Sequence, residues 1–156
     1  AGPELLRKLG CEVVPLGCDM DGQFAHELEP IPAHLGDVAR AVSESGVMIG
    51  FVLDPDADRL ALIDENGNCL SEELTLALAV QHRLSQYRGP VVANMSTSRV
   101  IADVCHRFDV PFYRSAVGEA NVVSLMRTSN AVIGGEGNGG VIDPRIGWVS
   151  EDDPPV

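Results

Sequence analysis

The sequence has no block of basic residues and contains a single lysine, Lys8. Its 11 lysine and arginine residues stand against 23 aspartates and glutamates, and the formal net charge at pH 7 is −12. A chain this acidic, with scattered positive charges, lacks a surface suited to a nucleic-acid backbone or an anionic membrane. We therefore expect neither as a partner. A few local arginines and backbone amides are still enough to bind a small phosphorylated ligand.

Long apolar segments and closely spaced cysteines are also missing. The longest apolar run, 47–53, is far short of the roughly twenty residues that a membrane helix needs. No charged-then-apolar leader opens the chain, so we expect a cytoplasmic protein. The four cysteines show neither zinc-type pairing nor the density of a disulfide framework, which indicates reduced and mostly buried thiols. Cys105 and His106 are adjacent, but helix neighbours point about 100° apart, which favours packing over a catalytic pair.

An alternation of helical and extended patterns indicates an α/β fold, and the 45% apolar content suffices for one domain or two small ones. Leu5, Leu6 and Leu9 share one face of an opening helix that ends at Gly10. The elements expected next are a strand over 12–16, a long loop over 17–34 with His26 and His34, an amphipathic helix ending near Gly46, a strand over 47–53, a returning strand over 60–63 and a hairpin turn at Asn66 and Gly67.

Ser71 is the expected N-cap of the following helix, with Leu74, Leu78 and Leu84 on its buried side. A linker over 86–90 then separates a first unit, 1–88, from a second unit, 89–156. The second unit repeats the alternation, with strands over 91–93, 111–114 and 131–133 and helices over 98–108 and 119–127. We therefore expect two consecutive α/β layered units with mixed sheets, followed by a disordered acidic tail rich in proline.

Asp54, Asp56 and Asp58 stand at alternate positions between two apolar segments. In an extended backbone their side chains would converge on one side. Carboxylates held a few ångströms apart repel one another unless a divalent cation neutralises them. An all-oxygen set of ligands suits Mg²⁺ or Ca²⁺ better than zinc, and Mg²⁺ is the cofactor we expect.

Other interpretations of the aspartate segment remain open. An EF-hand-type calcium loop would use the three aspartates and Glu65, but Arg59 stands where that loop needs glycine, and the flanks are β-like. A phosphatase resembling the haloacid dehalogenase family would use Asp54 as nucleophile and Asp56 as general acid. That family wants a downstream lysine, whereas Lys8 lies upstream. A solvated acidic turn would need neither three aspartates nor an apolar strand before them.

The segment 134–140 is a second candidate site, since five of its seven residues are glycine and it follows an apolar strand. Glycine lets backbone amides approach a ligand closely, and Glu136 and Asn138 would add side-chain specificity. A tight connection without a ligand is the alternative, because glycine motifs alone are weak signals.

The stretch Asp54-Pro55-Asp56-Ala57-Asp58-Arg59 is similar to the metal-binding loop of the α-D-phosphohexomutases, the superfamily of phosphoglucomutase, phosphomannomutase and phosphoglucosamine mutase. Residues 2–13 resemble the opening helix and strand of the family's second domain, and 24–30 resemble its substrate-side loop. Residues 117–119 and 134–140 resemble two loops of the third domain, the latter being the sugar-binding loop. The resemblance spans nearly the whole chain and implies domains 2 and 3, each truncated relative to the full-length family.

The resemblance also implies roles for single residues. Arg59 would contact the phosphoryl group during transfer, and an ion pair with Asp54 or Asp58 is compatible with that role. Gly118 and Glu119 match a loop that faces the sugar, whereas capping of the following helix is the alternative for Glu119.

Within the glycine-rich segment, Glu136 matches a glutamate that holds sugar hydroxyls in the resembled family. Asn138 replaces the usual serine and Gly140 stands where a histidine is common, a pattern similar to phosphoglucosamine-mutase-like members. The identity of the sugar therefore stays open at this point.

The implied function is Mg²⁺-dependent phosphoryl transfer between C6 and C1 of a hexose or hexosamine phosphate by way of a phosphoserine. The segment 95–98 lacks the histidine and asparagine that follow that serine in the family, so we expect the nucleophile outside this chain. The chain alone is then expected to be inactive. A non-catalytic divalent-metal or sugar-phosphate binding module is the alternative. Incomplete sheet edges would favour self-association of such a fragment.

Overall fold

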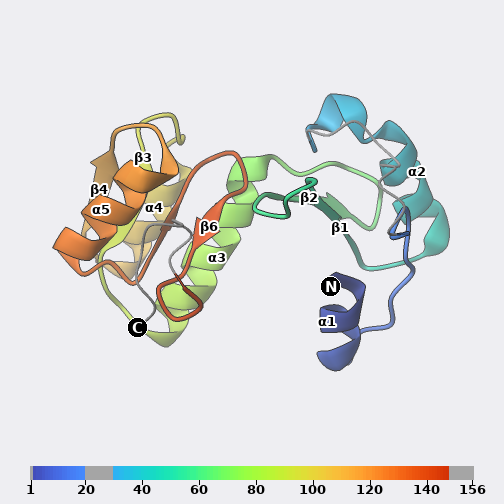
Figure 1. Ribbon diagram of the computed structural model, residues 1–156, viewed down its shortest axis with the longest axis horizontal. Coiled ribbons are helices and arrows are strands. Elements are labelled where there is room, and N and C mark those ends of the chain that lie inside the picture. The colour runs from blue at the N-terminus through green and yellow to red at the C-terminus, as the bar shows by residue number, and fades with distance from the viewer. Residues whose placement is uncertain (1, 20–29, 148–156) are drawn as a thin grey trace. The chain divides into compact units, whose positions relative to one another are not determined.

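The computed structural model describes residues 2–19 and 30–147, which divide into two compact units (Figure 1). The first unit comprises Ala1–Ala57 and Ala61–Leu70, and the second comprises Asp58–Leu60 and Ser71–Val156. Helices and strands alternate in both, so the predicted α/β class is confirmed. Of the loop predicted over 17–34, residues 17–19 and 30–34 are described, and Pro32–His34 form a 3₁₀ turn. The part of this loop with His26 and the part of the predicted tail after residue 147 lie outside the described residues.

The first unit is built around one amphipathic helix and a two-stranded sheet. Its elements are α1 (Gly2–Lys8), a 3₁₀ turn (Pro32–His34), α2 (Gly36–Ser45), β1 (Ile49–Leu53) and β2 (Leu60–Asp64). Val38 and Val42 of α2 pack with Leu35 and Ile63 in the core of this unit. Helix α2 ends where the sequence predicts, at Gly46, whose left-handed φ of 65° favours glycine.

The predicted hairpin turn after β2 is confirmed. The carbonyl oxygen of Asp64 accepts a hydrogen bond from the amide of Gly67 at 3.0 Å, and the amide of Asp64 donates to the carbonyl of Asn68 at 3.0 Å. Gly67 has a φ of 81°, and a Cβ there would lie 2.7 Å from the carbonyl oxygen of Ala39. Only glycine fits this turn without a shift of the helix beside it.

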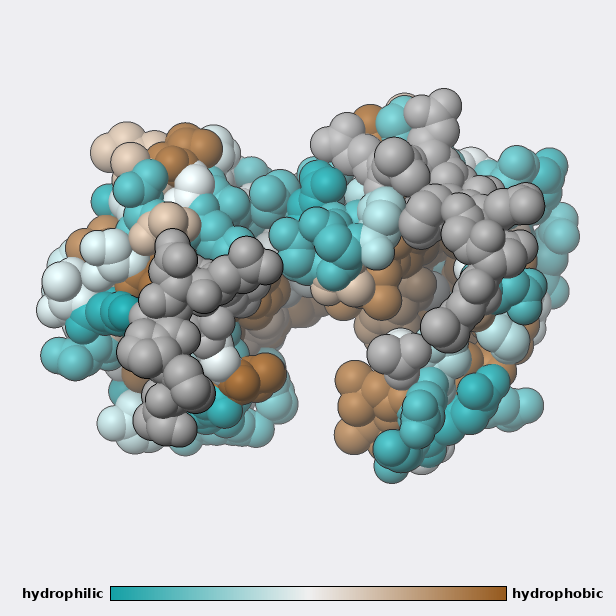
Figure 2. Space-filling model, viewed as in Figure 1, coloured by the Kyte–Doolittle hydropathy of each residue, from teal (hydrophilic) through white to brown (hydrophobic). Residues whose placement is uncertain are grey.

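One apolar face of strand β1 is exposed. Val52 is 5% exposed and belongs to the core, whereas Ile49, Phe51 and Leu53 on the opposite face are 39%, 45% and 40% exposed. Hydrophobic surface is visible on the first unit in Figure 2. The strand is therefore half-buried, with one apolar face toward α2 and the other toward solvent.

The prediction of a strand over 12–16 is wrong. Residues 11–15 have no regular secondary structure, and Val14 and Leu16 are 59% and 53% exposed. A segment becomes a strand only when its backbone groups find a partner, and within the described residues β1 pairs only with β2. Helix α1 forms as predicted but buries none of its residues.

The second unit is a three-layer α/β/α arrangement. Its strands are β3 (Val91–Asn94), β4 (Phe112–Ser115), β5 (Ile133–Gly135) and β6 (Val141–Ile142), in the order β4-β3-β5-β6. Strands β4, β3 and β5 are parallel, and β6 runs antiparallel to β5, so the predicted mixed sheet is confirmed. The helices are α3 (Glu72–Gln86), α4 (Val100–Phe108) and α5 (Glu119–Ser129).

Side-chain alternation along β3 explains why helices cover both faces of this sheet. Val91 and Ala93 belong to one core with α3 and α4, while Val92 belongs to another with Val122 and Met126 of α5. Every residue of β3 is buried, as expected for a central strand of a mainly parallel sheet. Because the whole strand is held in the sheet, the position of its polar last residue, Asn94, is fixed as well.

Helix α3 corrects the predicted division of the chain. The boundary expected between residues 88 and 89 lies instead near Leu70, because α3 belongs to the second unit. Its buried residues Leu76, Val80 and Leu84 pack in one core with Val91 and Ile133.

Two predicted details of α3 also differ in part. Leu78, predicted to be buried, is 49% exposed. Ser71 is the N-cap as predicted, but its side chain makes no capping hydrogen bond.

The cysteines are free, and the prediction that most are buried is wrong. Cys11 and Cys18 are exposed, Cys69 is half-buried and only Cys105 is buried. Burial raises the pKa of the Cys105 thiol to about 11, so the thiol stays protonated at neutral pH. Cys105 is part of the core of the second unit. No helix in 2–19 or 30–147 is long and apolar enough to cross a membrane.

Candidate functional site

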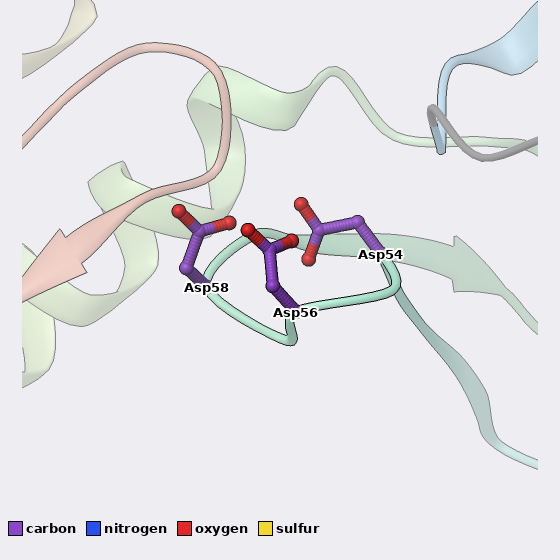
Figure 3. Close-up of side chains that lie close together, drawn as sticks. All are labelled: Asp54, Asp56 and Asp58. Atoms are coloured by element: carbon purple, nitrogen blue, oxygen red, sulfur yellow. The ribbon is translucent and has the colours of Figure 1, made fainter.

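Three aspartates converge in the loop between β1 and β2 (Figure 3). Asp54, Asp56 and Asp58 each offer a carboxylate oxygen, and the three oxygens lie within 4.8 Å of one another. Asp54 is buried, with 4% exposure, while Asp56 and Asp58 are exposed. One end of the cluster is therefore anchored in the protein and the other faces solvent.

A turn, and not the extended backbone that the sequence suggests, brings these carboxylates together. The carbonyl oxygen of Asp54 accepts a hydrogen bond from the amide of Ala57 at 3.1 Å. Ala57 adopts a φ of 61°, which is rare for a residue with a side chain. The chain reverses direction here, so the aspartates approach one another around the turn.

The donor set fits a hard divalent cation. It consists of carboxylate oxygens alone, without the sulfur or imidazole ligands that favour zinc. Mg²⁺ holds oxygens at about 2.1 Å, so ligand oxygens around it lie roughly 3–4 Å apart, and a small contraction of the loop reaches that spacing. Arg59 Nε lies 3.8 Å from Asp58 Oδ1 and offsets part of the negative charge. Asp54, Asp56 and Asp58 could therefore hold Mg²⁺.

The glycine-rich segment 134–140 forms the connection from β5 to β6. A Cβ on Gly135 would lie 2.2 Å from the carbonyl oxygen of Gly140, so the two backbone segments touch. The amide of Glu136 donates to that same carbonyl at 3.0 Å. The side chain of Asn138 stays within its own loop, where Oδ1 accepts from the amide of Gly140 at 3.2 Å.

Arg59 and Leu60 lie against this glycine-rich loop. Arg59 forms an antiparallel bridge with Gly140, and a Cβ on Gly139 would lie 2.9 Å from the carbonyl oxygen of Leu60. That oxygen also accepts from Thr75 Oγ1 of α3 at 2.7 Å. The residue expected to contact a phosphoryl group is thus adjacent in space to the loop expected to bind the sugar.

The carboxylate of Glu136 joins three loops of the second unit. Its Oε1 accepts hydrogen bonds from Asn94 Nδ2 and from the amide of Gly118, the latter at 3.1 Å. Asn94 ends β3, Gly118 precedes α5 and Glu136 follows β5. Of these, sequence reasoning missed Asn94, although an uncharged polar residue that ends an apolar strand is a signal for it.

Glu119 lies near Glu136 but receives no hydrogen bond from this network at its buried oxygen. Its Oε1 is buried and makes no hydrogen bond within the described part of the chain. Burial, and to a lesser degree the negative charge of Glu136, raise the pKa of the Glu119 carboxyl. The sequence-predicted residues Gly118, Glu119 and Glu136 therefore meet at one place, while the side chain of Asn138 bonds only within its own loop.

Polar groups gather at the carboxyl ends of the parallel strands β3, β4 and β5, which is where open α/β sheets bind their ligands. The fold is that of an α/β protein with these candidate site residues at this edge of the sheet. Its sequence matches the models of the phosphoglucomutase/phosphomannomutase family, α/β/α domain II over residues 1–67 and α/β/α domain III over residues 71–153. The chain belongs to this family, as the sequence motifs indicate.

Individual relatives agree with this assignment. A probable phosphoglucosamine mutase of Methanosarcina barkeri is 35% identical over 147 residues, which cover 94% of this chain and 33% of that protein. A phosphoglucomutase/phosphomannomutase of Thermococcus kodakarensis is 38% identical over 144 residues, or 91% of this chain and 32% of that protein.

Solved structures agree as well. A phosphoglucomutase/phosphomannomutase family protein from Burkholderia thailandensis superposes with a TM-score of 0.83 at 28% identity, over 96% of this chain and 33% of that one. The chain thus spans about a third of the length of the relatives it matches. Family membership sets aside the dehalogenase-like interpretation of the aspartate segment. The strands β1 and β2 on either side of the segment are not the helices that an EF-hand calcium loop requires.

Proposed function

We propose that this chain supplies the metal-binding and sugar-binding loops of a phosphohexomutase, which moves a phosphoryl group between C6 and C1 of a hexose or hexosamine phosphate. One observation carries the proposal. Three aspartate oxygens lie within 4.8 Å of one another directly before Arg59, whose backbone pairs with the glycine-rich loop at Gly140. A cation ligand set, a phosphate-binding side chain and a sugar-binding loop are the parts that such a transfer needs.

The aspartate loop would act on the phosphoryl group. Asp54, Asp56 and Asp58 would hold Mg²⁺, which when bound offsets the negative charge of a phosphoryl group in transfer. Arg59 follows directly, and its guanidinium can donate two parallel hydrogen bonds to phosphate oxygens. The ion pair between Arg59 and Asp58 keeps that guanidinium close to the ligand set.

The second-unit loops would bind the sugar. Both donors to Glu136 reach Oε1, from Asn94 Nδ2 and the Gly118 amide, and this leaves Oε2 to accept hydrogen bonds from sugar hydroxyls. Glu119 offers a further carboxylate, whose buried Oε1 makes no hydrogen bond in the described part of the chain. A sugar hydroxyl or amine is a donor of the kind that these oxygens need.

The nucleophile would come from outside these residues. The chain contains no Ser-His-Asn sequence, so the phosphoserine of the proposed reaction has no counterpart in it. We expect the 156-residue chain alone to leave hexose 1- and 6-phosphates unconverted, even with a hexose 1,6-bisphosphate added. Turnover by a clean preparation would place a nucleophile within the chain and contradict this part of the proposal.

The gene provides the first test of the proposal. An upstream Ser-His-Asn loop and a downstream Arg-Ser-Gly-Thr loop in the same gene would support a mutase. A gene without them would favour a non-catalytic module that binds a divalent metal or a sugar phosphate.

The second test is enzymatic. The complete gene product should interconvert the 1- and 6-phosphates of glucose, mannose or glucosamine, and a chelator should reduce the rate by at least about 100-fold, because a Lewis-acid cation contributes several kcal/mol to such a transfer. Readdition of Mg²⁺ should restore the rate. Equal rates with and without the chelator would overturn the metal-dependent mechanism.

A further inference from the structure

Asn94 is a buried polar residue, and both the oxygen and the NH₂ group of its side-chain amide form hydrogen bonds. It is 2% exposed at the end of β3. Its Oδ1 accepts from the amide of Thr97 at 3.0 Å, from Thr97 Oγ1 at 2.8 Å and from Ser96 Oγ at 2.9 Å. Its Nδ2 donates to Oε1 of Glu136, 42 positions further along the chain.

The network allows only one orientation of the Asn94 amide. A flipped amide would point its carbonyl oxygen at the carboxylate of Glu136 and its NH₂ group at the backbone N–H of Thr97. Both contacts would be repulsive, so the turn at Ser96 and Thr97 determines that Asn94 presents a donor to Glu136.

We propose that Asn94 is a positioning residue for the sugar-binding carboxylate. It holds Oε1 of Glu136 together with the Gly118 amide, and the second oxygen, Oε2, is thereby directed to the ligand without a loss of side-chain freedom on binding. This inference rests on the proposed function, since it assigns Glu136 to sugar binding.

If Asn94 had only a structural role, in the turn after β3, a change at Asn94 and the removal of Oγ1 from the neighbouring Thr97 would affect ligand binding alike. Thr97 is 3% exposed and bonds to the same Oδ1, but it makes no contact with Glu136 that the structure records in the described residues. Thr97→Ala is therefore a matched control for Asn94→Asp.

The first experiment detects the contact without any activity. Hydrogen exchange of the Asn94 side-chain amide, measured by NMR on the 156-residue chain, should be slow in the wild type and fast in Glu136→Ala. The backbone amide of Thr97 should stay protected in both. An Asn94 side-chain amide that exchanges at the rate of a free asparagine in the wild type would overturn the inference, whatever the enzyme does.

The second experiment measures sugar-phosphate binding by calorimetry on the complete gene product, with glucose 1-phosphate, mannose 1-phosphate and glucosamine 6-phosphate as probes. Asn94→Asp keeps the acceptor for Thr97 but replaces the donor to Glu136 by a carboxylate. Its Kd should rise by about 10- to 100-fold, the value of one hydrogen bond to a charged group, while Thr97→Ala stays within about threefold.

Binding should also recover in Asn94→Asp as the pH falls, because one proton shared between the two carboxyls restores a donor. The charged groups around this pair are Glu119 on α5, Arg114 on β4, which donates to the Asn94 carbonyl, and Glu73 on α3, which accepts from the Ser98 amide. These groups are the same in Thr97→Ala, which should show no such recovery.

The outcomes separate the two proposals. A wild type that binds none of the three probes overturns the proposed function and this inference with it. A wild type that binds them, with equal affinities for Asn94→Asp and Thr97→Ala, overturns only the role of Asn94.

Discussion

The acidic side chains at the candidate site differ in how their negative charge is compensated. Glu136 receives two N–H donors at one oxygen, and Asp58 lies near the guanidinium of Arg59. Glu119 has a buried oxygen without a hydrogen bond in the described residues and lies near the charge of Glu136. A buried carboxylate oxygen without a donor or a cation opposes folding, so Glu119 is one residue at which the site costs stability.

The raised pKa of Glu119 predicts a pH-dependent effect of Glu119→Gln. The folded protein binds this proton more tightly than the unfolded chain, so the contribution of Glu119 to stability falls as the pH rises through its folded-state pKa. Glu119→Gln should therefore be more stable than the wild type at neutral pH, and the difference should shrink as the pH falls through the raised folded-state pKa toward 4.5, the ordinary pKa, and level off below it. Urea unfolding at several pH values measures this, with exposed Glu44→Gln as the control. A difference that is constant with pH would contradict it.

The aspartate loop predicts weak binding of a divalent cation by the chain itself. Mn²⁺ can replace Mg²⁺ at oxygen ligands, and its binding is measured by water proton relaxation. Asp56→Asn removes one charge from the three-carboxylate set and should abolish the binding, whereas Asp37→Asn, an exposed change on α2, should not alter it. Equal Mn²⁺ affinities of Asp56→Asn and the wild type would show that the cation does not bind at these aspartates.

Among the elements, the connection from β5 to β6 is the most constrained by packing. Gly134 and Gly135 are buried at the end of β5, and a Cβ on either would fall within 2.5 Å of a neighbouring atom. On Gly134 the neighbours are the side chain of Met126 at 2.5 Å and the backbone oxygen of Val92 at 2.7 Å, and on Gly135 the nearest atom is the backbone oxygen of Gly140 at 2.2 Å. A side chain at either position would therefore require a shift of the backbone beside the strand that leads into Glu136.

Gly135→Ala should destabilise the protein by about 1–3 kcal/mol, because the new methyl group meets backbone that cannot rotate away. Gly36→Ala is the contrast: a Cβ there meets nothing within 4 Å, and alanine at the start of α2 should be neutral or stabilising by up to about 1 kcal/mol. Chemical denaturation measures both changes. Equal stabilities for the two variants would mean that the backbone at Gly140 moves freely.

On the scale of the whole molecule, the position of α3 decides how the chain divides. Four of its residues, Leu76, Ala77, Val80 and Leu84, are part of the core of the second unit. Each large apolar side chain buried there contributes roughly 1.5–3 kcal/mol, against a total stability of about 5–15 kcal/mol for a typical domain. A second unit without α3 would lose a large share of that margin.

Residues 71–156 should therefore fold by themselves, and residues 89–156 should not. The longer piece keeps the whole core, whereas the shorter one exposes the face of β3 and β5 that α3 covers. Thermal unfolding followed by circular dichroism should be cooperative only for the longer piece, and its amide NMR spectrum should be dispersed. Cooperative unfolding of residues 89–156 would show that α3 is dispensable to this core.

Much of this protein was determined by local sequence. The helix ends at Gly46, the hairpin at Gly67 and the alternation of helices and strands follow from residue types within a few positions of one another. The candidate site segments follow in the same way, because three aspartates and a glycine-rich loop carry their chemistry in their composition.

Only the tertiary structure decided the rest. The strand predicted over 12–16 failed for want of a partner, the division of the chain moved to Leu70 because α3 packs on strands that follow it, and the aspartates converge through a turn at Ala57. Asn94 reaches Glu136 across 42 positions. Each of these depends on contacts between residues far apart in sequence or on a backbone turn, which periodicity and residue type do not encode.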